Sequence, residues 1–266
     1  MQLVADGHAE RVPMIRSANA YFMPHRGVWK ENALTTKLRV VFDASSHRRD
    51  QDPLNARLTK GVDLNPSIVS LMIKFRIDRV AAIADLQKAF LQIRILDRDR
   101  DFLRFLWIYS DGRLIAYRMT SVPFGATCSP FLLAVVIRFH LLRHQSSHPS
   151  AGRLLGNIYV DDLVVTADSV DKMHSLHDDS VELFRKFSMH LHKWRASDIQ
   201  LDNEWSAADS PAEAKVLGTR WWPASDTIAP VAPMIGASVV SRRVLLRQLG
   251  SIFDPLGLWG SIIIDN

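Results

Sequence analysis

Cysteine is almost absent from this chain, since Cys128 is the one cysteine among 266 residues. A single thiol excludes an internal disulfide framework and a zinc cage built from cysteines, and it suits a reducing compartment. Long apolar runs are lacking too: the longest, Phe131 to Ile137, is far below the ~20 residues that cross a bilayer. Residues 1–20 are polar and contain no signal-peptide hydrophobic core. We therefore expect an intracellular protein that is neither secreted nor embedded in a membrane.

Composition is that of an ordinary globular protein. Hydrophobic residues make up 47% and charged residues 23% of the chain, and the length allows one large domain or two subdomains. The net charge of +5 is unevenly spread, because residues 1–120 hold 20 Lys and Arg against 13 Asp and Glu. A basic first half would attract a polyanion such as nucleic acid, and it would equally suit a solvated surface. Charge alone leaves both interpretations open.

Apolar spacing predicts a mixture of strands and helices. Short apolar or β-branched runs predict strands over residues 37–42, 80–84, 102–108, 114–119, 154–160 and 163–167. Apolar residues at three- and four-residue spacing predict helices over residues 67–75, 130–142, 170–190 and 241–252. Asp111-Gly112 predicts a hairpin turn, and strand–turn–strand structure is expected around Leu217-Gly218. The order of elements from Val80 to about Trp221 predicts one mixed sheet with helices on one face.

Three aspartates occupy the ends of predicted strands. Asp161 and Asp162 form the predicted turn between residues 154–160 and 163–167, and Asp85 ends the predicted strand 80–84. If the sheet sets these strands side by side, the carboxylates supply the oxygen ligands that Mg²⁺ prefers. Two such ions about 3.5–4 Å apart serve phosphoryl transfer. Aspartates at strand ends are also common as solvated turn residues, so this alternative stays open.

The segments around these acids resemble the reverse transcriptases of LTR retrotransposons. Tyr159-Val160-Asp161-Asp162 matches the Tyr-x-Asp-Asp motif of those polymerases. Residues 84–90 resemble the segment that carries their first metal-binding aspartate, and residues 123–130 resemble the loop that contacts template and nucleotide. A three-position motif recurs by chance, but the three segments occur in the family's order. The resemblance is greatest to the BEL/Pao group, through residues 21–25, 36–45, 54–75, 192–194 and 252–257.

The resemblance implies an α+β fold with the right-hand shape of polymerases. Its palm would be a ferredoxin-like or RRM-like antiparallel sheet with helices on one face. The fingers would comprise residues 1–79 and 97–122, the palm residues 80–96 and 123–226, and the truncated start of a thumb or connection region residues 227–266. In related polyproteins this block is fused to protease, RNase H and integrase segments, and copying takes place in a cytoplasmic particle.

The implied activity is that of an RNA-directed DNA polymerase, which adds dNTPs to the 3′-hydroxyl of a primer on an RNA or DNA template. Two Mg²⁺ or Mn²⁺ ions would be held by Asp85, Asp161 and Asp162 and by the backbone carbonyl of Leu86. Lys193 falls in the segment where related polymerases keep a lysine that protonates pyrophosphate.

The resemblance also implies nucleotide and nucleic-acid contacts. Lys37 and Arg39 would hold the triphosphate, for which a guanidinium fork is suited. Phe90 would exclude a ribose 2′-hydroxyl, and Gly125 would allow the backbone to approach the nucleotide. Primer and template contacts are expected from Phe124, Tyr159, Leu217 and Gly218, and Trp221 and Trp222 would either stack on nucleic acid or pack in the core.

Two other functions were weighed against polymerase activity. An inactive or host-retained fragment would bind nucleic acid without polymerising. A metal-dependent nuclease is disfavoured, because no further acid or basic residue stands out beside the three aspartates. His140 and His144 at helical spacing lack a third ligand and a His-Glu-x-x-His pattern, so we do not expect a metal site there.

Overall fold

The computed structural model describes residues 2–14, 20–29, 38–47, 49–231, 241, 243–244 and 252–258. The chain divides into two compact units: the first contains Met1–Leu64 and Lys88–Arg138, and the second contains Asn65–Gln87 and Phe139–Asn266. The boundaries of fingers and palm expected from the sequence stay a prediction. Within the described part of the chain, no helix is long and apolar enough to span a membrane.

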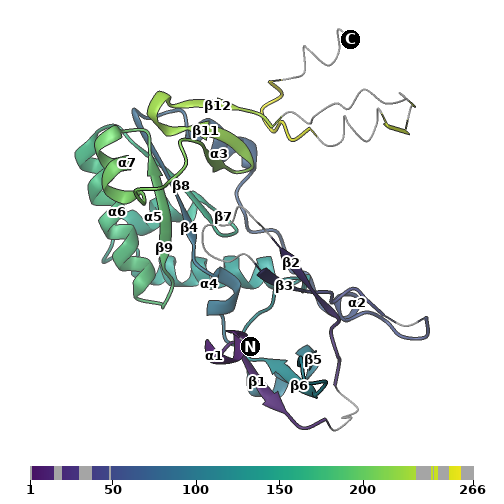
Figure 1. Cartoon of the computed structure of the whole chain (residues 1–266). Coiled ribbons are helices and arrows are strands. Elements are labelled where there is room, and N and C mark those ends of the chain that lie inside the picture. The colour runs from purple at the N-terminus through teal and green to yellow at the C-terminus, as the bar shows by residue number, and fades with distance from the viewer. Residues whose placement is uncertain are drawn as a thin grey trace. The chain divides into compact units, whose positions relative to one another are not determined.

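The first unit is built from short strands and short helices (Figure 1). Strands pair antiparallel in the order β1-β6-β5, and β2 pairs with β3 in a separate sheet. The hairpin predicted at Asp111-Gly112 is confirmed as β5–β6. The elements are α1 (Gln2–Ala5), β1 (Ala9–Val12), β2 (His25–Trp29), β3 (Leu38–Phe42), α2 (Leu54–Arg57), η1 (Ala89–Gln92), η2 (Asp97–Leu103), β5 (Arg104–Ile108), β6 (Leu114–Met119) and the beginning of α4 (Ser129–His144).

Aromatic side chains from three of these strands form the core of the first unit. The ring of Phe105 lies edge-on to Phe42, with 5.1 Å between ring centroids, and stacks on Tyr117 at 5.7 Å. The hydroxyl of Tyr117 lies 2.7 Å from that of Tyr109. Such aromatic pairs contribute about 0.5–1.5 kcal/mol each beyond the burial of their surface. The core therefore joins β3 to the β5–β6 hairpin.

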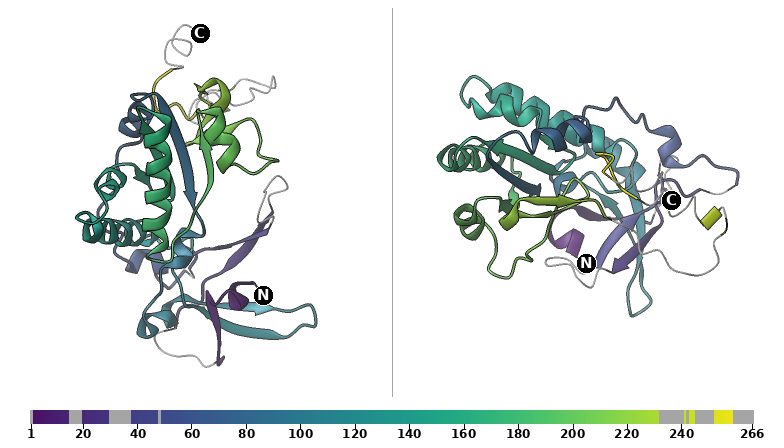
Figure 2. Two further views of the ribbon diagram at one scale, coloured as in Figure 1. Left: turned by 90° about the vertical axis from the view of Figure 1, so that its left-hand side faces the viewer. Right: turned by 90° about the horizontal axis from the view of Figure 1, so that it is seen from above.

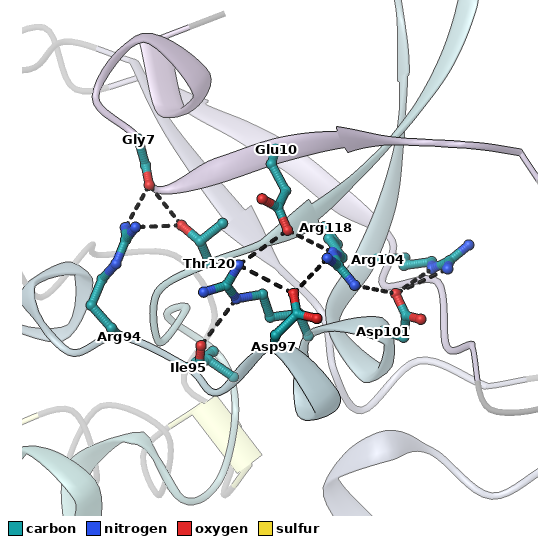
Figure 3. A network of polar contacts seen from close by, with 10 residues as sticks. Gly7, Glu10, Arg94, Ile95, Asp97, Asp101, Arg104, Arg118 and Thr120 are labelled. Carbon is teal, nitrogen blue, oxygen red and sulfur yellow. Dashed lines mark hydrogen bonds and ion pairs between the residues drawn. The ribbon is translucent and has the colours of Figure 1, made fainter.

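A group of ion pairs ties β1 to β6 and η2 (Figure 3). Arg118 donates to Glu10 and Asp97 at 2.7 Å each and to Asp101 at 3.0 Å, and Arg104 donates to Asp101 at 2.9 Å. Burial lowers the pKa of Arg118, but the hydrogen bonds to Glu10 and Asp101 outweigh it and leave this pKa above its ordinary value. Part of the basic excess in the first half of the sequence therefore stabilises the unit itself.

The second unit contains a four-stranded sheet in the order β7-β8-β4-β9, in which every pairing is antiparallel (Figure 1). A smaller sheet has the order β10-β11-β12. The elements of this unit are α3 (Ile68–Lys74), β4 (Val80–Leu86), the end of α4, α5 (Ser150–Leu155), β7 (Ile158–Tyr159), β8 (Asp162–Ala167), α6 (Val170–Arg185), β9 (Leu191–Ala196), α7 (Ile199–Trp205), β10 (Ala214–Val216), β11 (Thr219–Trp222), η3 (Pro223–Ser225) and β12 (Thr227–Ala229).

Helices cover both faces of the four-stranded sheet. Leu71 and Met72 of α3 are fully buried in a cluster with Ala81 and Val164, which lie on one face of the sheet. Helix α6 contacts β4, β8 and β9 and runs alongside β4 (Figure 2). None of the described residues of α6 belongs to the α3 cluster, so α6 covers the opposite face. The expectation of helices on one face only is therefore wrong.

Several other predictions from the sequence need correction. The expected single mixed sheet is wrong, because β5 and β6 pair with β1 in the first unit. The strand predicted over residues 154–160 begins too early, because Leu154 and Leu155 end the helix α5 (Ser150–Leu155) and only Ile158–Tyr159 is a strand; a short apolar run does not distinguish a strand from a buried helix. Helix α6 begins after Ser169, as predicted, but ends at Arg185. Most of the helix predicted over residues 241–252 lies outside the described residues.

Candidate active site

The hairpin that carries two of the aspartates has a strained turn. Tyr159 pairs with Asp162, so the two loop residues are Val160 and Asp161, and Asp162 is the first residue of β8 rather than part of the turn predicted from the sequence. The φ angle of Val160 is 56°, in the left-handed region. Two-residue hairpin loops require positive φ at this position and favour glycine there. A β-branched residue in this conformation costs about 1–3 kcal/mol.

The sheet brings the aspartates and two further side chains into one row. Tyr159 of β7 lies opposite Asp162 of β8, which lies opposite Asp85 of β4, which in turn lies opposite His192 of β9. Directly opposed residues of antiparallel strands project from the same face. Asp161 follows in the adjoining turn, where its carbonyl oxygen accepts a hydrogen bond from the backbone amide of Leu86 at 2.8 Å. Three carboxylates and the Leu86 backbone thus occupy one edge of the sheet face.

Two basic side chains of β9 contact Asp85. Nζ of Lys193 donates to Oδ2 of Asp85 at 2.6 Å, and Nε2 of His192 lies 3.1 Å from the same oxygen. Burial raises the pKa of Asp85, but the hydrogen bonds from His192 and Lys193 outweigh it, so the pKa of Asp85 lies below its ordinary value. Asp85 is therefore a carboxylate at neutral pH, with a cation already beside it.

Asp162 is in the opposite electrostatic situation. Burial, together with the charges of Asp161 and Asp85, raises the pKa of Asp162 from 3.8 to about 7, although Lys193 acts in the other direction. The ionised form is disfavoured because burial removes it from water and because the nearby carboxylates repel it. A cation bound between these oxygens would remove that repulsion.

We expect the raised pKa of Asp162 to appear as a pH-dependent difference in stability between the parent chain and Asp162→Asn. In a fully buried group, a pKa raised from 3.8 to about 7 corresponds to about 4 kcal/mol, and partial exposure of Asp162 reduces the expected value to about 1–2 kcal/mol. A raised carboxyl pKa destabilises the folded state as pH rises from about 4 to about 7. Urea unfolding in EDTA should therefore show Asp162→Asn gaining on the parent chain between pH 5 and pH 8. If the two proteins differ in unfolding free energy by the same amount at pH 5 and at pH 8, the pKa of Asp162 is not raised.

The oxygen-rich side chains suit a hard cation such as Mg²⁺. Their arrangement is not a finished cage, because no group of three or more His, Cys, Asp or Glu side chains in the described part of the chain is close enough to hold a metal ion. The physical reason is the contact of Asp85 with Lys193 and His192, which directs this carboxylate toward β9. The chemistry of the donors fits a divalent cation, which would compete with Lys193 and His192 for the charge of Asp85.

Comparison with solved structures identifies the fold. The chain is similar to a foamy viral protease-reverse transcriptase solved in complex with double-stranded DNA, with a TM-score of 0.62 and 15% sequence identity over 93% of this chain. The chain has a reverse transcriptase-like fold. It spans 37% of the length of that neighbour. No protein-family model and no curated protein matches the sequence, so the BEL/Pao assignment stays a prediction.

The residues predicted to bind nucleotide lie in the first unit of this reverse transcriptase-like fold. Phe90 is buried and its ring is edge-on to Phe124, with centroids 4.8 Å apart. Arg39 lies in β3 opposite Val28, and Lys37 falls outside the described residues. The Asp85 row lies in the second unit. That the two sets form one nucleotide site stays a prediction.

The β10–β11 hairpin resolves one alternative left open by the sequence. Trp221 is fully buried, edge-on to Phe75 at 5.0 Å, and its indole nitrogen donates to Asp226 at 3.0 Å. Trp221 therefore packs in the core and is unavailable for stacking on nucleic acid. The two loop residues, Leu217 and Gly218, both have positive φ, and the side chain of Leu217 is buried. Contact of this turn with a primer stays a prediction.

Two residues beside the carboxylates were missed by sequence reasoning. His192 belongs to a segment that carries the family resemblance, but its place opposite Asp85 depends on the register of β9, including an irregularity between Ile83 and Asp85. Asn65 accepts a hydrogen bond from the amide of Val160, and it lies in residues 54–75, which also carry the resemblance. The resemblance marked both segments, but no local pattern showed that His192 lies opposite Asp85 or that Asn65 contacts Val160. Nε2 of His140 lies 3.0 Å from the carbonyl oxygen of Leu183, with which it forms a hydrogen bond.

Proposed function

We propose that the chain is the RNA-directed DNA polymerase domain of an LTR retrotransposon polyprotein of the BEL/Pao type. The observation that carries the proposal is the direct pairing of Asp85 with Asp162, with Asp161 in the adjoining turn, in a reverse transcriptase-like fold. In this proposal Tyr159-Val160-Asp161-Asp162 is the Tyr-x-Asp-Asp motif of an active polymerase, and its two aspartates bind the metal ions. Lys193 and His192 are basic groups beside Asp85, which the sequence did not lead us to expect. The polymerase is nevertheless favoured over a nuclease, because the fold is reverse transcriptase-like.

We assign the four-stranded sheet to the palm. Its strands and the helices between them include β4, α4, α5, β7, β8, α6 and β9 in this order, and its strands are arranged as β7-β8-β4-β9. This alternation of strands and helices with an antiparallel sheet supports a ferredoxin-like palm. The three aspartates then lie where the β7–β8 hairpin meets β4. The first unit would supply the fingers.

In the proposed reaction, two Mg²⁺ or Mn²⁺ ions held by Asp85, Asp161, Asp162 and the Leu86 carbonyl would activate the primer hydroxyl and neutralise the phosphate charge. The 3′-oxygen of the primer bonds to the α-phosphorus of a dNTP, and the bond from that phosphorus to the pyrophosphate oxygen breaks. Lys193, whose ammonium lies 2.6 Å from Asp85 in the metal-free chain, would become available to give a proton to the leaving pyrophosphate. Positioning and charge neutralisation supply the catalysis.

The proposed partners are an RNA or DNA template with its primer, and dNTPs. The similar foamy viral protein is fused to a protease and is bound to double-stranded DNA. We propose that this chain likewise forms part of a longer polyprotein with protease, RNase H and integrase segments. Its basic first half would contact the nucleic-acid backbone, so binding should weaken steeply as salt is raised.

The test is extension of a labelled primer on an RNA template by the purified chain, with dNTPs and Mg²⁺ or Mn²⁺. We expect products that grow one nucleotide at a time, with no product in EDTA, because the three carboxylates alone cannot neutralise the phosphates. Salt-sensitive binding of the template–primer without extension would instead support the alternative, a fragment that binds nucleic acid without polymerising. If the chain neither binds the template–primer nor extends the primer, both functions are contradicted.

A further inference from the structure

One side chain outside the aspartate motif contacts the strained turn. Oδ1 of Asn65 accepts a hydrogen bond from the backbone amide of Val160 at 3.1 Å, across 95 positions of sequence. Val160 is the residue with a φ of 56° between Tyr159 and Asp161. Asn65 therefore contacts the backbone at the one point in the hairpin where the conformation is unfavourable for an L side chain.

Asn65 is itself held firmly in place. Pro66 follows it and restricts its backbone to the extended region. Helix α3 begins three residues after Asn65, and Leu71 and Met72 anchor that helix in the core below the sheet with no exposed surface. The acceptor oxygen is thus attached to a rigid part of the second unit.

Two hydrogen bonds join the turn to neighbouring elements. The carbonyl oxygen of Asp161 accepts from the amide of Leu86 at 2.8 Å, next to Asp85 on β4. The amide of Val160 donates to Asn65. The first hydrogen bond joins two backbones and the second depends on one side chain. Loss of the Asn65 oxygen would remove the hydrogen bond to the residue that has the positive φ.

We propose that Asn65 is a positioning residue, which holds Val160 in its left-handed conformation and so fixes the Asp161 carboxylate relative to Asp85. The effect on catalysis rests on the proposed polymerase function. The effect on the turn does not, because it concerns a hydrogen bond of the metal-free chain. The two parts can therefore be measured separately.

The structural part is tested by hydrogen exchange of residues 157–163, followed by mass spectrometry. Asn65→Ala should exchange about tenfold faster at the turn, because a hydrogen bond and the shielding it gives are lost. Asn65→Asp keeps an acceptor oxygen and should retain the protection. Ser67→Ala is the matched control, since Ser67 is exposed, lies at the same helix start and makes no side-chain capping hydrogen bond.

The catalytic part is tested by primer extension at varied Mg²⁺ concentration. Asn65→Ala should need about tenfold more Mg²⁺ for half-maximal rate, because the Asp161 ligand is less well positioned, while its affinity for template–primer and that of Ser67→Ala stay at the parent values. Parent-like exchange in Asn65→Ala would overturn the inference. If the parent chain extends no primer, the proposed function fails, and the exchange measurement still decides whether Asn65 holds the turn.

Discussion

Replacing Asp161 with asparagine should abolish primer extension while leaving the chain folded. Asparagine keeps the size of the side chain and removes the charge that a divalent ion requires. Metal ions contribute several kcal/mol to such transition states, so we expect a rate at least about 10³-fold lower. The hydrogen bond from Leu86 reaches the backbone carbonyl of residue 161, so the substitution leaves it in place.

Stability provides an independent readout for the same variant. The charge of Asp161 is one cause of the raised pKa of Asp162, so metal-free Asp161→Asn should unfold at an equal or higher denaturant concentration than the parent. Asp168→Asn is the matched control, because Asp168 is an exposed carboxylate that follows β8 and pairs with Lys172. Extension by Asp161→Asn at more than about a tenth of the parent rate would contradict the proposed role of Asp161 as a metal ligand.

Gly125→Ala should destabilise the first unit by about 2–5 kcal/mol. The φ angle of Gly125 is 103°, where an L side chain is strained, and a Cβ there would lie 2.3 Å from the carbonyl oxygen of Phe42. The strain costs about 1–2 kcal/mol, and the contact with a backbone atom adds about 1–3 kcal/mol, because neither side can move freely. Thermal or urea unfolding should show the loss.

Gly112→Ala separates the two contributions. Gly112 also has positive φ, 81°, but no atom lies within 4 Å of the Cβ it would gain. Gly112→Ala should therefore lower the free energy of unfolding only by the backbone strain, about 1–2 kcal/mol. Gly125 was predicted from the sequence to give room to a nucleotide. Normal stability with weakened dNTP binding in Gly125→Ala would support that role and contradict the packing with Phe42.

Patterns of neighbouring residues predicted the local elements well. The run Val80–Ala84 is part of β4, Asp-Gly marks the β5–β6 turn, and Ser169 accepts a hydrogen bond from the amide of Lys172 at the start of α6. These features depend on periodicity, turn chemistry and capping, which act within a few residues. Local patterns gave a wrong prediction where one apolar run suits both a strand and a helix: Leu154 and Leu155 were assigned to a strand but belong to the helix Ser150–Leu155.

The candidate site shows the same division. The sequence by itself determined which acids are present, that Asp85 ends an apolar strand, and that Asp161 and Asp162 lie in or beside a hairpin turn. Only the tertiary structure decided that β4 pairs with β8 in the register that opposes Asp85 to Asp162, and that β9 adds His192 to the row. Register and long-range contacts such as that of Asn65 follow from the packing of whole faces, which is a cooperative property that no short segment encodes.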